Sequence, residues 1–88
     1  MNIYVGNLPK DMEEDEIYEM FMEYGKVSNV KIIRDHHTRI SRGYAFVEMI
    51  DEKAALEAIK DWDKGSIDDQ IIHVNVAHSS QKKRTSLQ

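Results

Sequence analysis

The chain has 88 residues, which suits one compact domain and is too short for two. Its formal net charge is −4, and the absence of cysteine excludes disulfides, thiolate metal ligands and cysteine nucleophiles. No apolar run is long enough to span a membrane and no signal-peptide pattern is present, so we expect a cytosolic or nuclear protein and favour a cytoplasmic location.

The first quarter of the chain predicts a strand and a helix. The short apolar run from Ile3 to Gly6 is β-rich and ends at turn residues, which is typical of a buried strand. Asp11 is the expected N-cap of the helix that follows, and Gly25 is its expected end. The apolar face of this helix consists of Ile17, Met20, Phe21 and Tyr24.

The middle of the chain predicts two strands joined by a polar loop. The strands cover residues 27–34 and 43–49, and the loop covers residues 35–41. Tyr44, Phe46 and Glu48 alternate with Ala45, Val47 and Met49 in the second of these strands. Because successive side chains point to opposite faces of a sheet, only one of the two sets can face the core.

The last third repeats the pattern of the first. Asp51 can cap a helix that ends near Gly65 and carries the apolar residues Ala55, Ala58, Ile59 and Trp62. A strand over residues 71–76 then places Ile72, Val74 and Val76 opposite His73 and Asn75. The order βαββαβ predicts an α+β fold, a ferredoxin-like sandwich in which two helices cover one face of a four-stranded antiparallel sheet. We expect residues 1–78 to form this domain and residues 79–88 to form a flexible basic tail.

The open face of the predicted sheet carries aromatic side chains, and the charges are segregated along the chain. The strand residues expected in the core are Ile3, Val5, Ala45, Val47, Met49, Ile72, Val74 and Val76. If this core set faces the helices, Tyr4, Tyr44 and Phe46 must point toward solvent. From Asp11 to Glu23 there are seven acids and no Lys or Arg, whereas residues 26–47 contain five bases and one acid. A local positive surface can therefore persist on this acidic chain.

Two segments of the chain resemble motifs of a known family. Residues 42–49 (RGYAFVEM) resemble the RNP1 octapeptide of the RNA recognition motif family at seven of eight positions, with Met49 as the exception. Residues 3–8 (IYVGNL) resemble its RNP2 hexapeptide. The resemblance covers about residues 1–78, and the chain is similar to the small single-motif RNA-binding proteins of bacteria.

The resemblance implies a non-enzymatic, monomeric domain that binds single-stranded RNA, with single-stranded DNA as a second candidate, and that needs neither a cofactor nor a metal. By this resemblance Tyr4 and Phe46 each stack one base, Tyr44 lies between two sugars and Arg42 contacts a phosphate. The implied role is post-transcriptional regulation or RNA chaperoning. The candidate RNA-binding residues are Tyr4, Asn7, Lys31, Arg39, Arg42, Tyr44, Phe46, His73, Asn75 and His78.

Two other function classes share this topology. Acylphosphatase-like enzymes bind phosphate in the loop after the first strand, but residues 7–10 contain no Arg and too few glycines for that site. A protein-interaction module on the same fold is the main alternative, and it usually lacks one or more of the stacking aromatics that this chain retains.

Overall fold

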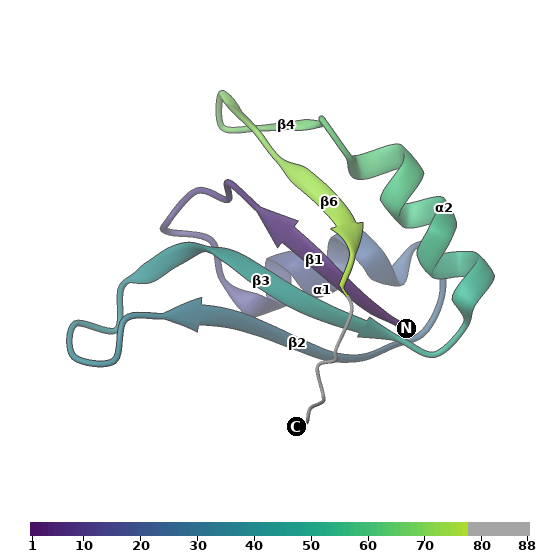
Figure 1. Ribbon diagram of the computed structural model, residues 1–88, viewed down its shortest axis with the longest axis horizontal. Coiled ribbons are helices and arrows are strands. Elements are labelled where there is room, and N and C mark those ends of the chain that lie inside the picture. Colours follow the sequence, from purple (N-terminus) through teal and green to yellow (C-terminus); the bar gives the residue numbers. More distant parts are fainter. Residues whose placement is uncertain (78–88) are drawn as a thin grey trace, which may run out of the picture.

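The computed structural model describes residues 1–77 and contains one main sheet with two helices on one side (Figure 1). The elements are β1 (Asn2–Gly6), α1 (Glu14–Met22), β2 (Val27–Arg34), β3 (Ser41–Met49), α2 (Glu52–Trp62), β4 (Ser66–Ile67), β5 (Gln70–Ile71) and β6 (His73–Val76). The predicted βαββαβ order is confirmed, with one small hairpin added before the last strand. His78 and the predicted tail 79–88 lie outside the described residues, so the domain boundary at 78 stays a prediction.

The sheet has the strand order β2-β3-β1-β6, and all its neighbouring strands are antiparallel. The central strand β1 pairs Val5 with Ala45 of β3 and with Val74 of β6, and all three side chains are fully buried. In Figure 1, α1 passes behind β1 and β3. Because these three side chains are fully buried, they face the helix-covered side of the sheet. The predicted core set is confirmed except for Val76, which is only half-buried near the end of the described chain.

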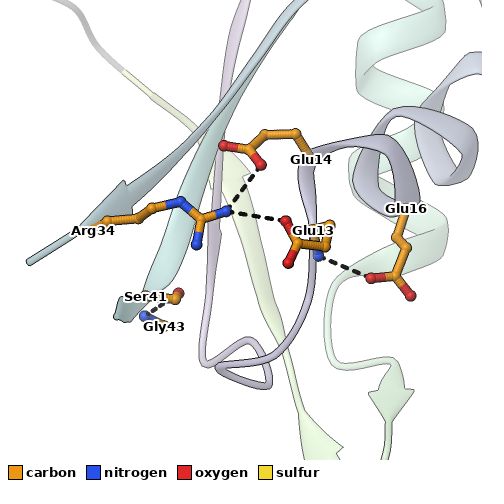
Figure 2. A network of polar contacts seen from close by, with 6 residues as sticks. All are labelled: Glu13, Glu14, Glu16, Arg34, Ser41 and Gly43. Atoms are coloured by element: carbon orange, nitrogen blue, oxygen red, sulfur yellow. Dashed lines mark hydrogen bonds and ion pairs between the residues drawn. The ribbon is translucent and has the colours of Figure 1, made fainter. Parts of the chain in front are cut away.

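The start of α1 differs from the prediction. The N-cap is Glu13, whose backbone N–H donates a hydrogen bond to Oε1 of Glu16 over 2.8 Å (Figure 2). Asp11 instead lies in the preceding turn, where it is exposed. This later start places Met12 directly before the N-cap and Ile17 in the first turn, and both side chains are buried. Apolar residues at these two positions fix the angle at which a chain enters a helix.

The end of α1 also differs from the prediction. The helix ends at Met22, and Gly25 does not take the left-handed conformation of a glycine cap. A Cβ atom at Gly25 would lie 2.7 Å from Cβ of Ala54 in α2. Gly25 therefore allows α2 to approach the segment that follows α1 closely. No helix in the described part of the chain has the length and apolar character needed to cross a membrane.

The hairpin β4–β5 was not predicted. Asp68 and Asp69 form its two-residue turn with φ values of 50° and 68°, the left-handed pair that a type I′ turn requires. The predicted strand 71–76 is interrupted because Ile72 pairs with the segment that follows α2. Its N–H donates to the carbonyl of Gly65, and its own carbonyl accepts from the N–H of Lys64, each over 2.9 Å.

Replacing Asp51 by alanine should lower the free energy of unfolding by about 1 kcal/mol. The Asp51 carboxylate accepts a hydrogen bond of 3.2 Å from the N–H of Ala54 at the first turn of α2. Urea denaturation followed by circular dichroism measures the change. Asp11→Ala is the matched control, because it removes the same charge from an exposed turn that caps no helix. An equal loss for both variants would contradict the assignment of Asp51 as the N-cap.

Candidate functional site

Three aromatic rings meet on the face of the sheet that the helices leave open. Tyr4 of β1 lies directly opposite Phe46 of β3 in the antiparallel register, and Tyr44 is two residues before Phe46. The ring centroids are 5.9 Å apart for Tyr4 and Tyr44, 5.9 Å for Tyr4 and Phe46, and 6.1 Å for Tyr44 and Phe46. We call these three residues the aromatic platform. The structure thus brings together the rings that strand alternation places on one face.

The rings of the platform are accessible and do not stack on one another. The angles between their planes range from 37° to 89°, so each pair is tilted or meets edge to face. Phe46 is 36% exposed, which is unusual for a phenylalanine in a domain with a well-formed core. Ring surface that is not used in packing remains available to a planar ligand.

The position of the Tyr4 ring depends on the glycine two residues later. Tyr4 and Gly6 face the same side of β1, and a Cβ atom at Gly6 would collide with the hydroxyl end of the Tyr4 ring. The ring therefore lies over Gly6, along the strand. A glycine at this position is needed for the close approach of a side chain to the backbone.

Polar side chains flank the platform on the neighbouring strands. Lys31 of β2 lies opposite Phe46, and Asn75 of β6 lies opposite Tyr4. His73 lies opposite Gly6. All three predicted residues are exposed, and the register places them on the same open face. The positive charge of Lys31 therefore borders the rings on the β2 side, and the polar side chains of His73 and Asn75 border them on the β6 side.

Arg42 and the β2–β3 loop lie at one end of the platform. The guanidinium of Arg42 is 3.6 Å from the Asp35 carboxylate, and 57% of its side chain is exposed. Hydrogen bonds from the N–H groups of Thr38 and His37, together with the charge of Arg42, hold the pKa of Asp35 below its usual value. Arg39 has a φ of 65°, so it takes the left-handed conformation that glycine adopts more easily. The loop holds Arg39 outside the sheet.

Arg34 is turned away from the open face. Its guanidinium contacts the carboxylates of Glu13 at 3.4 Å and Glu14 at 2.9 Å, at the start of α1 (Figure 2). Desolvation acts to raise the pKa of Glu14, but hydrogen bonds from its own N–H and from Arg34 outweigh it, and the pKa is lowered. The basic segment is therefore divided, because Lys31 and Arg42 lie on the open face whereas Arg34 pairs with two carboxylates at the start of α1.

A depression of about 790 Å³ adjoins the platform at the end of β1. Its lining consists of Tyr4, Asn7, Leu8, Lys10, Arg42, Gly43, Tyr44, Gln70 and His73. The Nδ2 atom of Asn7 donates to the carbonyl of Ile71 over 2.7 Å, and Gln70 donates to the carbonyl of Asn7 over 3.0 Å. Asn7 thus has a structural task, which is to hold the β4–β5 hairpin against the end of β1.

Lys10 and Gln70 line this depression but were not among the predicted site residues. Lys10 could have been found from its basic charge just after the first strand. Gln70 gave no such signal, because it enters the site only through the hairpin that the strand pattern did not predict.

Comparisons with known proteins agree with this architecture. The family model described as RNA recognition motif matches residues 3–73. A chloroplastic 31 kDa ribonucleoprotein of Nicotiana sylvestris is 37% identical over 83 residues, which is 94% of this chain and 26% of that protein. The chain spans 26–35% of the length of the first three curated relatives.

Solved structures with the same fold include proteins of similar sequence. The crystal structure of an RNA-binding protein named PG1 superposes with a TM-score of 0.86 and 37% identity, over 89% of this chain and 94% of that one. A complex of Sxl-lethal protein with RNA superposes with a TM-score of 0.84 and 34% identity, over 88% of this chain and 46% of that one.

Proposed function

The chain belongs to the RNA recognition motif family, and on this premise we propose that it binds single-stranded RNA on the aromatic platform. The observation that carries the proposal is the cluster of Tyr4, Tyr44 and Phe46, with centroids about 6 Å apart on an open sheet face. Every unpaired base offers a π-face to such rings, whereas the bases of a duplex are already stacked on each other.

In the proposed complex Tyr4 and Phe46 each stack one base, and Tyr44 lies between two sugars. Arg42 contacts the phosphate that links the nucleotides, and Lys31, His73 and Asn75 contact base edges or phosphates. Stacking contributes about 1–3 kcal/mol per base. Two or three bases with a few cations therefore give a binding free energy on the order of −8 kcal/mol, which corresponds to a dissociation constant in the micromolar range. Because few cations face the RNA, the affinity falls only modestly with salt, with a log-log slope of about −2.

The proposal includes no catalytic step, and it places the domain in post-transcriptional regulation or RNA chaperoning as a monomer. The Nicotiana sylvestris relative is named a ribonucleoprotein. Single-stranded DNA offers the same base faces and is the second candidate ligand. We retain the cytoplasm as the proposed location. Because that relative is chloroplastic, a plastid is the alternative location. Microscopy of a tagged full-length protein would distinguish a plastid from the cytoplasm.

Titration of the ¹⁵N-labelled chain with a seven-nucleotide single-stranded RNA tests the proposal. The amide signals of Tyr4, Tyr44, Phe46 and Asn75 should shift, whereas those of α1 should not. A duplex of the same sequence is the matched control and should shift the platform signals much less. If no RNA sequence shifts these signals, or if RNA shifts only the signals of α1, the proposal fails. The protein-interaction module then becomes the better interpretation.

A further inference from the structure

The end of the platform that is farther from Arg42 carries a carboxylate. Glu48 is two residues beyond Phe46 in β3, so it lies on the same open face, and it is exposed. The rise of a strand places it about 6.6 Å from Phe46. Asn2 of β1 and Asn29 of β2 are its register partners on either side. A row of polar side chains thus crosses the sheet directly beside the ring that is proposed to stack a base.

A β-bulge in β2 fixes the direction of this carboxylate. The register shifts between Val27 and Asn29, which leaves Ser28 as the extra residue. The hydroxyl of Ser28 lies 3.1 Å from Oε1 of Glu48 and 3.2 Å from the carbonyl oxygen of the same residue. Bulges are often used to re-aim a side chain beside a site. Here the bulge supplies a donor that holds the Glu48 carboxylate against the edge of the sheet.

The second carboxylate oxygen of Glu48 remains available to a ligand. Within residues 1–77, no ion pair involves Glu48, and no hydrogen bond reaches its Oε2 atom. A carboxylate accepts hydrogen bonds only, and it repels phosphate. At the opposite end, Lys10, Arg42 and His73 line the depression. The positive charges of Lys10 and Arg42 attract phosphate. Arg42 is six residues before Glu48 in the sequence, about 20 Å along the strand.

We infer that Glu48, held by Ser28, selects a guanine at the nucleotide bound next to Phe46. This inference rests on the proposed RNA-binding function. The Watson–Crick edge of guanine presents two adjacent donors, N1–H and N2–H. One can donate to Oε2 of Glu48, and the other to the lone pair of Oε1 that Ser28 leaves free. Adenine, cytosine and uracil each place an acceptor beside their donor on that edge, and this acceptor is repelled by the carboxylate. Unpaired bases in single-stranded RNA can be read on this edge.

Fluorescence anisotropy with labelled RNAs of the sequences UUGUU, UUAUU, UUCUU and UUUUU tests the inference at one salt concentration. The wild-type chain should bind UUGUU about tenfold more tightly than the other three, because one good base contact discriminates by about that factor. Glu48→Gln should reduce the guanine preference to about twofold or less while affinity for UUUUU stays equal or rises. Ser28→Ala keeps the charge but frees the carboxylate, and it should reduce the preference several-fold.

Glu57→Gln is the matched control, because it removes the same charge from an exposed position on α2. It should retain the full guanine preference. Equal binding of all four RNAs by the wild-type chain would overturn the inference and leave the proposed function intact. So would a preference that survives in Glu48→Gln. Failure to bind any of the four RNAs would count against the proposed function and against the inference with it. Circular dichroism of each variant confirms that the fold is unchanged.

Discussion

Replacing Phe21 by alanine should lower the free energy of unfolding by about 3–5 kcal/mol, the usual effect of removing a buried phenylalanine. The side chain of Phe21 is fully buried, and it belongs to the same core cluster as Ile3, Ile17 and Met49. Alanine would leave a cavity between α1 and the sheet that neighbouring side chains can fill only partly. Because a domain of this size has only about 5–15 kcal/mol of stability in total, the loss is a large fraction of it.

Urea denaturation followed by the fluorescence of the single tryptophan, Trp62, measures this loss. Met22→Ala is the matched control, because Met22 is the next residue of α1 and is 47% exposed. It should change the stability by a few tenths of a kcal/mol. Phe21→Leu retains most of the volume and should fall between the two. If Phe21→Ala and Met22→Ala unfold at the same urea concentration, Phe21 does not pack in the core.

The open face of the sheet could be predicted from sequence because its cause is local and periodic. In β3 the buried residues Ala45, Val47 and Met49 alternate with the exposed Phe46 and Glu48, and the period of two leaves no other arrangement once helices cover one face. The apolar stripes of the two helices are equally clear in the sequence. They indicate which face of the sheet the helices cover. The periodicity of a strand does not determine which strands are neighbours, and the observed register shows that β1 lies beside β3.

Features that depend on contacts far apart in the sequence were not predictable in the same way. Asp11 fits the pattern of an N-cap, but the burial of Met12 moves the start of α1 to Glu13. The pairing of Arg34 with Glu14 joins residues that are 20 positions apart. The charge pattern of the sequence therefore could not show that Arg34 lies away from the open face. The turn at Asp68 has a local signal, the Asp pair that follows Ile67, but the β-rich pattern of residues 71–76 predicts one continuous strand.

Truncation of either stacking ring should weaken RNA binding while the fold persists. Tyr4→Ala and Phe46→Ala should each cost about 1–3 kcal/mol of binding free energy, which is about 5- to 150-fold in the dissociation constant. The rings lie on the face opposite the core, so their removal leaves the helix-facing layer of the sheet unchanged. Fluorescence anisotropy with a labelled single-stranded RNA measures the affinity, and thermal unfolding verifies the fold.

Matched variants separate stacking from other effects of these substitutions. Phe46→Tyr and Tyr4→Phe retain an aromatic face and should bind within about threefold of wild type, because stacking needs the ring rather than the hydroxyl. Tyr18→Ala removes a ring that is 42% exposed on α1, on the other side of the molecule, and should leave affinity unchanged. Since the Tyr4 and Phe46 centroids are only 5.9 Å apart, the double variant also tests whether each ring holds its own base. Two independent bases give additive losses, whereas one shared base gives a second loss much smaller than the first. RNA binding that survives both truncations would mean that the platform is not the binding surface.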